Sequence, residues 1–240
     1  MLEVKDLTVK AGEKVILEDV SFVFEAGKTY AIMGPNGSGK STLAKVIMGH
    51  PDYEVVAGKV IYEGYDITEL EPHKRAKLGL FLGFQNPLEL SGVSVVELLQ
   101  VALTGKKRIL EIRREVAEVA KKLKIRDELI TRSLNMGASG GERKKLELLQ
   151  AVVLDPKAAI FDEIDTGVDV DALRVIAGLL NKTFVHQAGR ILILITHYNR
   201  ILDYVVPDQV LVMVDGEIVK TGPASLAREI EEKGYEKINF

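Results

Sequence analysis

The sequence predicts an α/β fold in which a mainly parallel sheet is covered by helices. Three apolar runs, "AAIFD" at 158–162, "ILILI" at 191–195 and "QVLVMV" at 209–214, have the continuous hydrophobicity of strands buried on both faces. They lie among helix-like segments, the arrangement typical of a parallel sheet. A fourth apolar run, "TYAIM" at 29–33, leads into a glycine-rich segment, "GPNGSGKST" at 34–42. No linker, repeat or low-complexity segment interrupts the 240 residues, so we expect one domain spanning 1–240.

The opening third adds a second kind of strand. Val20, Phe22 and Phe24 alternate with polar neighbours, and so does the segment "KVIYEG" at 59–64. Alternation of this kind predicts half-buried antiparallel strands. Between these two patterns, "GKSTLAKVIMG" at 39–49 reads as a helix that Gly49 ends. We therefore expect an antiparallel β subdomain beside the parallel sheet.

The middle of the chain is predicted to be helical. Apolar residues recur at three- and four-residue intervals with a charged face between them: Ile109, Ile112, Val116, Val119 and Leu123. "ERKKLELLQAVVL" at 142–154 is helix-like again. We expect a helical subdomain inserted at about 86–150, and a charged helix in "ASLAREIEEKGYEKI" at 224–238.

Composition narrows the class of protein. The formal net charge of −3 gives no electrostatic reason to expect nucleic acid as a partner. The chain has no cysteine, which excludes disulfides and thiolate metal sites. The apolar runs are far shorter than the roughly 20 residues that span a bilayer, and no signal-peptide pattern opens the chain. We expect a cytoplasmic protein without direct membrane insertion.

The glycine-rich segment fits the P-loop pattern G-x-x-x-x-G-K-[ST] at Gly34, Gly39, Lys40 and Ser41. Its backbone N–H groups can surround phosphate oxygens, Lys40 can contact the β/γ phosphates, and the Ser41 hydroxyl can ligate Mg²⁺. A chance glycine-rich turn is the alternative, which the placement between strand and helix disfavours. Mg²⁺ and a nucleotide that carries β- and γ-phosphates are therefore expected. The predicted nucleotide-binding residues here are Gly34, Pro35, Asn36, Gly37, Ser38, Gly39, Lys40, Ser41 and Thr42.

A second motif, "AAIFDEID", delivers two carboxylates to the carboxyl end of a predicted strand. Ligands of open α/β sheets bind at that end. Asp162 is suited to hold Mg²⁺ through water, and Glu163 to orient or deprotonate the attacking water. The alternative is an acidic strand end that simply faces solvent. The presence of a P-loop in the same chain disfavours this alternative.

A third motif connects the chain to a family. "MGASGGERKK" at 136–145 resembles the signature of ATP-binding-cassette (ABC) ATPases, with Ser139, Gly140 and Gly141 opening a helix. A helix N-terminus favours phosphate, although Ser is also an ordinary N-cap. Gln85, Asp169 and His197 follow where the family has its Q-loop, D-loop and switch histidine. Together with the P-loop and "AAIFDEID" these make six motifs in the order that the family has along its chain, and the resemblance identifies an ABC ATPase fold: a P-loop NTPase with a RecA-like core.

This resemblance implies roles for single residues. Glu163, His197, Lys40 and Gln85 are the expected catalytic residues, and Ser41, Gln85 and Asp162 the expected metal ligands. The family forms an ATP-dependent head-to-tail homodimer, in which the signature residues and Asp169 meet the partner's nucleotide. One departure is the stretch "LTVKAGEKV" at 7–15, which lacks the aromatic that stacks on adenine in many relatives. The stem of Lys10 or Val15 is the expected substitute.

A narrower resemblance covers most of the chain. "GLFLGFQNPLELSGVSV", "DEIDTGVDVDAL", "THYNRILDY" and "EEKGY" are similar to the ATPase family of the Suf iron–sulfur cluster assembly machinery. This resemblance implies SufB- and SufD-like scaffold proteins as partners. The alternative is the nucleotide-binding subunit of an ABC membrane transporter.

Two further expectations concern regulation and docking. Charge and spacing suggest that Lys144 or Lys145 pairs with an acidic residue of "DEID" and restrains Glu163 in the resting state. The apolar segment "NPLELSGVSVVELL" at 86–99 follows Gln85, and we expect Leu88, Leu90 and Val93 at a partner-docking surface.

Overall fold

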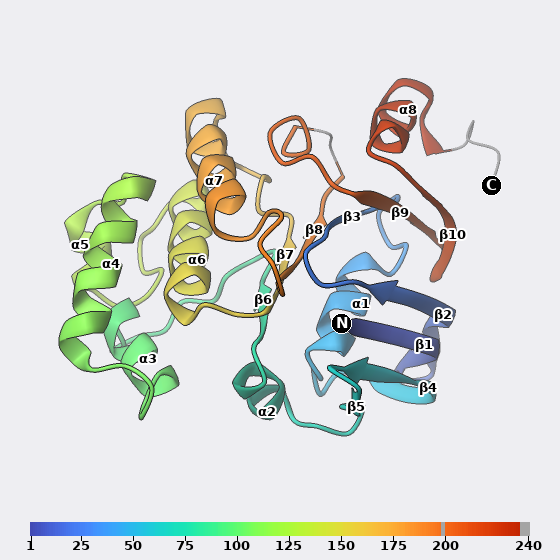
Figure 1. Ribbon diagram of the computed structural model, residues 1–240, viewed down its shortest axis with the longest axis horizontal. Coiled ribbons are helices and arrows are strands. Elements are labelled where there is room, and N and C mark those ends of the chain that lie inside the picture. The colour runs from blue at the N-terminus through green and yellow to red at the C-terminus, as the bar shows by residue number, and fades with distance from the viewer. Residues whose placement is uncertain (198–199, 236–240) are drawn as a thin grey trace.

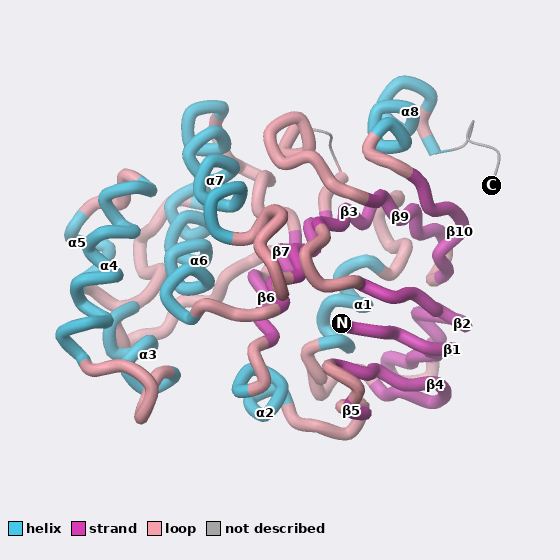
Figure 2. The backbone as a smooth tube through the Cα atoms, in the orientation of Figure 1, coloured by secondary structure: helices cyan, strands magenta, loops and turns pink. Residues whose placement is uncertain are grey.

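A computed structural model describes residues 1–197 and 200–235, and within them the strands form two sheets (Figures 1 and 2). The four-stranded sheet is antiparallel and has the order β2-β1-β4-β5. Its strands are β1 (Leu2–Ala11), β2 (Lys14–Phe24), β4 (Glu54–Tyr62) and β5 (Tyr65–Asp66). The alternating patterns of the first third thus form antiparallel strands, as predicted.

The six-stranded sheet has the order β10-β9-β3-β8-β7-β6. Its strands are β3 (Thr29–Met33), β6 (Leu80–Gly83), β7 (Ala158–Asp162), β8 (Ile191–Ile195), β9 (Gln209–Val214) and β10 (Glu217–Gly222). Neighbours from β9 to β6 are parallel, and only β10 pairs antiparallel, with β9. Every residue of β3, β7 and β8 is buried, as the continuous apolar runs predicted.

One helix lies between the two sheets (Figure 1). It is α1 (Lys40–Ile47), which shares a hydrophobic core with the antiparallel sheet and one face of the larger sheet. Gly39 precedes it in a left-handed conformation (φ 97°), which a glycine adopts without strain. The helix ends at Ile47, and Gly49 follows in a left-handed conformation as well (φ 76°), so the predicted stop is confirmed.

Most helices lie on the other face of the larger sheet and beyond it. Between β6 and β7 the chain forms α3 (Val95–Ala102), α4 (Ile109–Leu123), α5 (Asp127–Thr131) and α6 (Gly140–Leu154). The bounds of α4 coincide with the predicted amphipathic helix. Four of its five predicted apolar positions are buried, and Ile109 is partly buried. This group stands apart from the antiparallel sheet in Figure 1. That the segment at about 86–150 is a subdomain of its own remains a prediction.

Three helices complete the described chain: α2 (Pro72–Lys77), α7 (Val170–Thr183) and α8 (Ser225–Lys233). α8 is shorter than the helix expected at 224–238, because Gly234 takes a left-handed φ of 74° directly after Lys233. The last residues of that expected helix, 236–238, lie outside the described residues. In the part of the chain that the structure describes, each helix is too short or too polar to cross a bilayer.

Candidate nucleotide site

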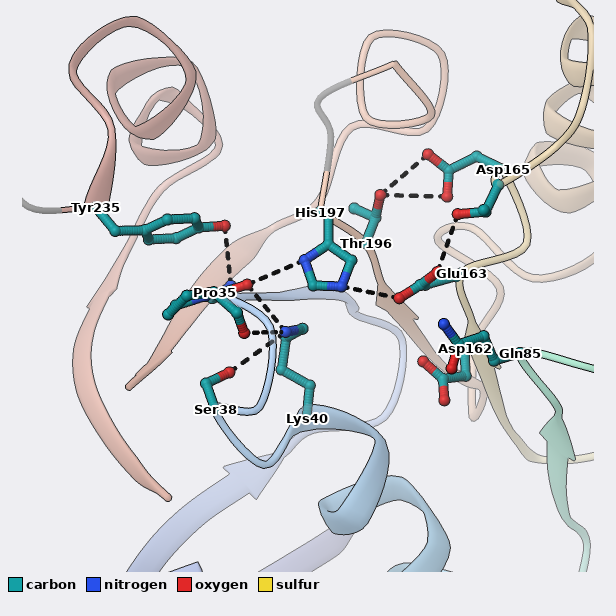
Figure 3. Close-up of polar contacts among 12 residues, drawn as sticks. Pro35, Ser38, Lys40, Gln85, Asp162, Glu163, Asp165, Thr196, His197 and Tyr235 are labelled. Carbon is teal, nitrogen blue, oxygen red and sulfur yellow. Dashed lines mark hydrogen bonds and ion pairs between the residues drawn. The ribbon is translucent and has the colours of Figure 1, made fainter. Parts of the chain in front are cut away.

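The predicted motifs converge at the carboxyl ends of the parallel strands. The P-loop follows β3, Asp162 ends β7 with Glu163 directly after it, and His197 lies two residues beyond β8 (Figure 3). These three strands are neighbours in the sheet, in the order β3-β8-β7. A cavity of about 490 Å³ lies there, and its lining includes most of the predicted site: Lys14, Ile16, Asn36, Gly37, Gly39, Lys40, Ser41, Thr42, Gln85, Glu163 and His197.

Lys40 is held by the loop that precedes it. Its ammonium donates to the carbonyl oxygens of Gly34 (2.9 Å) and Pro35 (2.8 Å) and to Ser38 Oγ (3.3 Å). Burial lowers the pKa of Lys40, while the charges of Glu163 and Asp162 oppose that shift. The loop therefore holds a buried cation at the cavity that a polyphosphate would fill.

Glu163 contacts His197 directly. His197 Nε2 lies 2.8 Å from Glu163 Oε1, and Thr166 Oγ1 donates to Glu163 Oε2 at 3.0 Å. The other ring nitrogen, His197 Nδ1, lies 3.1 Å from the carbonyl oxygen of Gly34. Glu163 has a φ of 53°, a left-handed conformation that is unusual for a side chain of this kind and clusters at functional sites. The predicted water-positioning residue is thus buried, strained and bridged to the P-loop through histidine.

Asp162 and Ser41 provide oxygen atoms that suit a hard divalent cation. The Asp162 carboxylate is buried, and its Oδ1 has no hydrogen-bond partner among the described residues. Burial raises the pKa of Asp162, and a hydrogen bond from the Ser41 side chain opposes the shift. A buried, unsatisfied carboxylate oxygen beside a serine hydroxyl fits the oxygen-donor chemistry of Mg²⁺. Gln85 lines the same cavity.

Lys144 does not form the predicted ion pair. Its ammonium donates to the carbonyl oxygens of Phe84 (2.8 Å), Gln85 (2.7 Å) and Asp162 (3.3 Å), and burial lowers its pKa. Three carbonyls therefore solvate this buried cation in place of a carboxylate. Among the described residues, Lys145 forms no ion pair with an acidic residue of "DEID" either, and Glu163 is paired with His197. The expectation that one of these lysines restrains Glu163 was therefore wrong.

Glu147 lies on the same helix, one turn further along α6. Its Oε1 accepts from the backbone N–H of Phe84 at 2.6 Å. Burial raises the pKa of Glu147 to about 8, against the opposing charge of Lys144. Together, Lys144 and Glu147 fix the backbone that leads into Gln85. Sequence reasoning gave Glu147 no role, because a glutamate within a helical pattern carries no local signal of burial.

Ser139, Gly140 and Asp169 are exposed, Gly141 is partly buried, and none of these residues lines the cavity. Ser139 is the N-cap of α6 in a capping box: its Oγ accepts from Glu142 N (3.3 Å), and its own N–H donates to Glu142 Oε2 (2.9 Å). Asp169 caps α7 by accepting from Ala172 N at 2.8 Å. The two helix starts are close, since Cβ atoms added at Gly140 and Gly141 would lie 4.0 and 3.9 Å from the Gly167 carbonyl oxygen. They form a second surface, separate from the P-loop.

The wall of the cavity that comes from β2 differs from the expectation. Lys14 and Ile16 line it, whereas Lys10 and Val15 do not. Side chains alternate across a strand, so Val15 faces away from the side that Ile16 occupies. Ile16 therefore lies at the cavity in place of Lys10 or Val15, the residues expected to contact the adenine.

Two contacts at the site have no counterpart in the sequence-based prediction. Thr166 holds one oxygen of Glu163, and Tyr235 Oη accepts a hydrogen bond from Gly34 N at 3.0 Å. Tyr235 closes the "EEKGY" segment that supported the family resemblance, but no spacing rule connects it with a residue 201 positions earlier.

The fold and this site define a nucleotide-binding cassette, and the family comparison agrees. Residues 17–166, well over half of the chain, match the family described as "ABC transporter". The chain belongs to this family and is an ATPase of the ABC type. A nucleotide-free cassette from an ABC transporter has a TM-score of 0.78 at 27% identity, covering 100% of this chain and 99% of that one.

More similar relatives place the chain within a narrower group. It is 44% identical to the "probable ATP-dependent transporter SufC" of Escherichia coli K12, over 98% of this chain and 97% of the relative. It is 45% identical to "probable ATP-dependent transporter ycf16" of Pyropia yezoensis, over 99% and 97% respectively. The expected fold and the expected group of ATPases are thereby confirmed.

Proposed function

We propose that this protein is the ATP-hydrolysing subunit of a SufBCD-like complex that drives iron–sulfur cluster assembly on a soluble scaffold in the cytoplasm. The observation that carries this proposal is the 44% identity with SufC across almost the whole length of both chains. The sequence identity with the nucleotide-free transporter cassette of the same fold is 27%. The stretches that resemble the Suf family include those around the catalytic motifs, so the similarity extends to the site.

In the proposed reaction, the P-loop and Lys40 bind the β- and γ-phosphates. Glu163 then orients the water that attacks the γ-phosphorus, and His197 fixes the Glu163 carboxylate and the P-loop relative to each other. The 2.8 Å contact between His197 and Glu163 supports this pairing. Lys144 and Glu147 of α6 bind the backbone at Phe84 and Gln85. A movement of Gln85 at the nucleotide would therefore be transmitted to the helices that follow it.

We further propose that Ser41, Asp162 and Gln85 hold Mg²⁺. When bound, this ion would supply positive charge that offsets the negative charge developing on the phosphate oxygens. Asp162 contributes an otherwise unpaired carboxylate oxygen, and the Ser41 hydroxyl lies next to it.

The exposed surface formed by Ser139, Gly140, Gly141 and Asp169 is proposed to complete the site of a second copy. The N-terminus of α6 presents free backbone N–H groups and a favourable dipole to an anion. Within one chain these groups lie outside the P-loop cavity. A head-to-tail homodimer that traps ATP between the P-loop of one copy and the signature of the other would use both surfaces.

Iron chemistry is assigned to the partners. The chain has no cysteine and four histidines, and protein-held clusters are ligated chiefly by cysteine. The ATPase would therefore change the shape of SufB- and SufD-like scaffolds that hold the cluster as their cargo.

The proposed docking surface begins just after Gln85. The side chain of Leu88 is 74% exposed, Leu90 is exposed as well, and Val93 is partly buried. An apolar groove of about 640 Å³ adjoins the start of this segment, with Phe84 and Leu78 among the exposed residues of its lining. An amphipathic helix of a scaffold protein is the occupant that such a groove fits.

The test is to isolate the tagged protein from its host without detergent and to identify its stable partners. SufB- and SufD-like proteins without membrane spans are the expected companions, in stoichiometric amounts. Recovery of a membrane permease instead would contradict the proposal and favour the transporter alternative.

A further inference from the structure

Tyr235 reaches the P-loop from the far end of the chain. It follows α8, and its ring is half-buried and packs against the larger hydrophobic core. Figure 3 shows its hydroxyl directed at the loop that carries Pro35, where it accepts the hydrogen bond from Gly34 N at 3.0 Å. The hydroxyl of the half-buried Tyr235 thus binds one backbone amide of the nucleotide site.

Gly34 connects several residues of the site through its two peptide groups. Its N–H, in the peptide with Met33, donates to Tyr235, and its carbonyl, in the peptide with Pro35, accepts from Lys40 Nζ at 2.9 Å and lies 3.1 Å from His197 Nδ1. The glycine has no room for a side chain: a Cβ there would lie 2.1 Å from the Met213 carbonyl oxygen. The position of the Gly34 backbone therefore sets the direction of the carbonyl that His197 and Lys40 share.

We propose that Tyr235 is a positioning residue for ATP hydrolysis: its hydroxyl holds the Gly34 N–H and so fixes the backbone from which the Gly34 carbonyl orients His197 against Glu163. This inference rests on the proposed role of His197 in hydrolysis. It adds a link from the C-terminal segment to the catalytic pair, which no sequence motif indicated.

The contacts of Lys40 and His197 predict whether kcat or KM changes when the Tyr235 hydroxyl is removed. Lys40 keeps its bonds to Pro35 and Ser38 when the Gly34 carbonyl shifts. In the described part of the chain, His197 has only Glu163 besides that carbonyl. Loss of the tyrosine hydroxyl should therefore disturb His197 more than Lys40, so kcat should fall more than KM for ATP rises.

The first experiment compares two Tyr→Phe variants that lose equivalent bonds. Tyr235→Phe removes the bond to Gly34 N, and Tyr30→Phe removes a bond in which the Tyr30 hydroxyl accepts from Glu25 N at 2.7 Å. Both keep the ring, and both should lower the melting temperature to a similar extent. We expect kcat to fall roughly three- to tenfold in Tyr235→Phe, with KM within about twofold, and to stay at the wild-type value in Tyr30→Phe.

The second experiment observes His197 without relying on turnover. Four histidines give few imidazole ¹⁵N–¹H signals, and His197→Ala identifies the signal of His197. This signal should shift in Tyr235→Phe and stay in place in Tyr30→Phe. In the His197→Ala background, Tyr235→Phe should lower the residual kcat no further.

An unshifted His197 signal, an unchanged kcat in Tyr235→Phe, or an equal fall in kcat in both backgrounds would overturn the inference. Failure of the proposed function would look different. His197→Ala itself would then hydrolyse ATP at nearly the wild-type rate, whatever Tyr235→Phe does.

Discussion

The two halves of the candidate site differ in how the chain holds them. At the strand ends, Lys40, Glu163 and His197 are joined by hydrogen bonds to one another or to the same P-loop peptide. At the starts of α6 and α7, Ser139 and Asp169 are exposed, and among the described residues each side chain accepts only from an amide of its own helix. The first half is organised by contacts between distant segments, and the second half by local caps.

This difference indicates what each half needs in order to act. The strand-end half already holds its charged groups in place, and electrostatic catalysis requires such preorganisation. The helix-start half offers N–H groups and a dipole but no phosphate-binding lysine. We therefore propose that its contribution depends on a nucleotide presented by another copy.

The largest expected effect comes from the half that is already organised. Glu163→Gln keeps the shape of the side chain but removes the carboxylate that orients water, so kcat should fall about 10²- to 10³-fold. ATP affinity should change little, because this role belongs to the transition state. Steady-state ATPase assays and nucleotide titration measure the two quantities.

Lys40→Ala is the contrasting variant, because Lys40 binds phosphate in the ground state as well. ATP affinity itself should weaken in this variant. Near-normal turnover in Glu163→Gln would refute the assignment of Glu163.

Docking should respond to charge at the segment after Gln85. Leu88→Asp, Leu90→Asp and Val93→Asp should each abolish co-purification with the scaffold partners, since a carboxylate in an apolar contact is desolvated without a partner. ATP binding and the melting temperature should be preserved. Leu110→Asp is the matched control, since Leu110 on α4 is 76% exposed, close to the 74% of Leu88. If all three variants bind partners as the wild type does, this surface is misplaced.

A smaller effect concerns the pH dependence of stability around the Q-loop. Burial raises the pKa of Glu147 from 4.5 to about 8, so between these values the folded state keeps a proton that the unfolded state has lost. The stability that this group contributes is fully present below pH 4.5 and is lost as the pH rises through 8. Glu147→Gln keeps an acceptor for Phe84 N without titrating. Its melting temperature relative to the wild type should therefore rise between pH 5 and pH 9, on the order of 5 °C.

The control for that experiment is Glu142→Gln. Bonds to Arg126 and Ser139 lower the pKa of Glu142 despite the opposing effect of burial, so it is ionised throughout this range. Its difference from the wild type should stay constant from pH 5 to pH 9. A constant difference for Glu147→Gln as well would show that Glu147 does not titrate in this window.

The sequence predicted what depends on local pattern. The apolar run at 191–195 became β8 and the heptad-like spacing at 109–123 became α4 with the same bounds, because burial follows directly from periodicity. The motifs also located the P-loop and the two carboxylates at the end of β7, Asp162 and Glu163.

Contacts between segments far apart in the sequence could not be predicted from local sequence patterns. Lys144 was expected to meet a carboxylate, yet the packing of α6 against β6 places it among carbonyls. Tyr235 and Gly34 are brought together only by the topology of the sheet and α8. Such contacts cannot be predicted from the identity and spacing of residues, because the contacts depend on how whole helices and strands pack.

In the proposed dimer, one chain supplies only half of each working site. Mixing a Lys40→Ala variant with a Ser139→Arg variant tests it, because each mixed dimer then has one site with an intact P-loop and an intact signature. Random pairing makes about half of the dimers mixed, so about a quarter of the wild-type ATPase rate should return. Lys40→Ala mixed with the double variant Lys40→Ala/Ser139→Arg should stay inactive. If the two single variants recover no activity under conditions in which wild-type dimers form, the shared-site account is wrong.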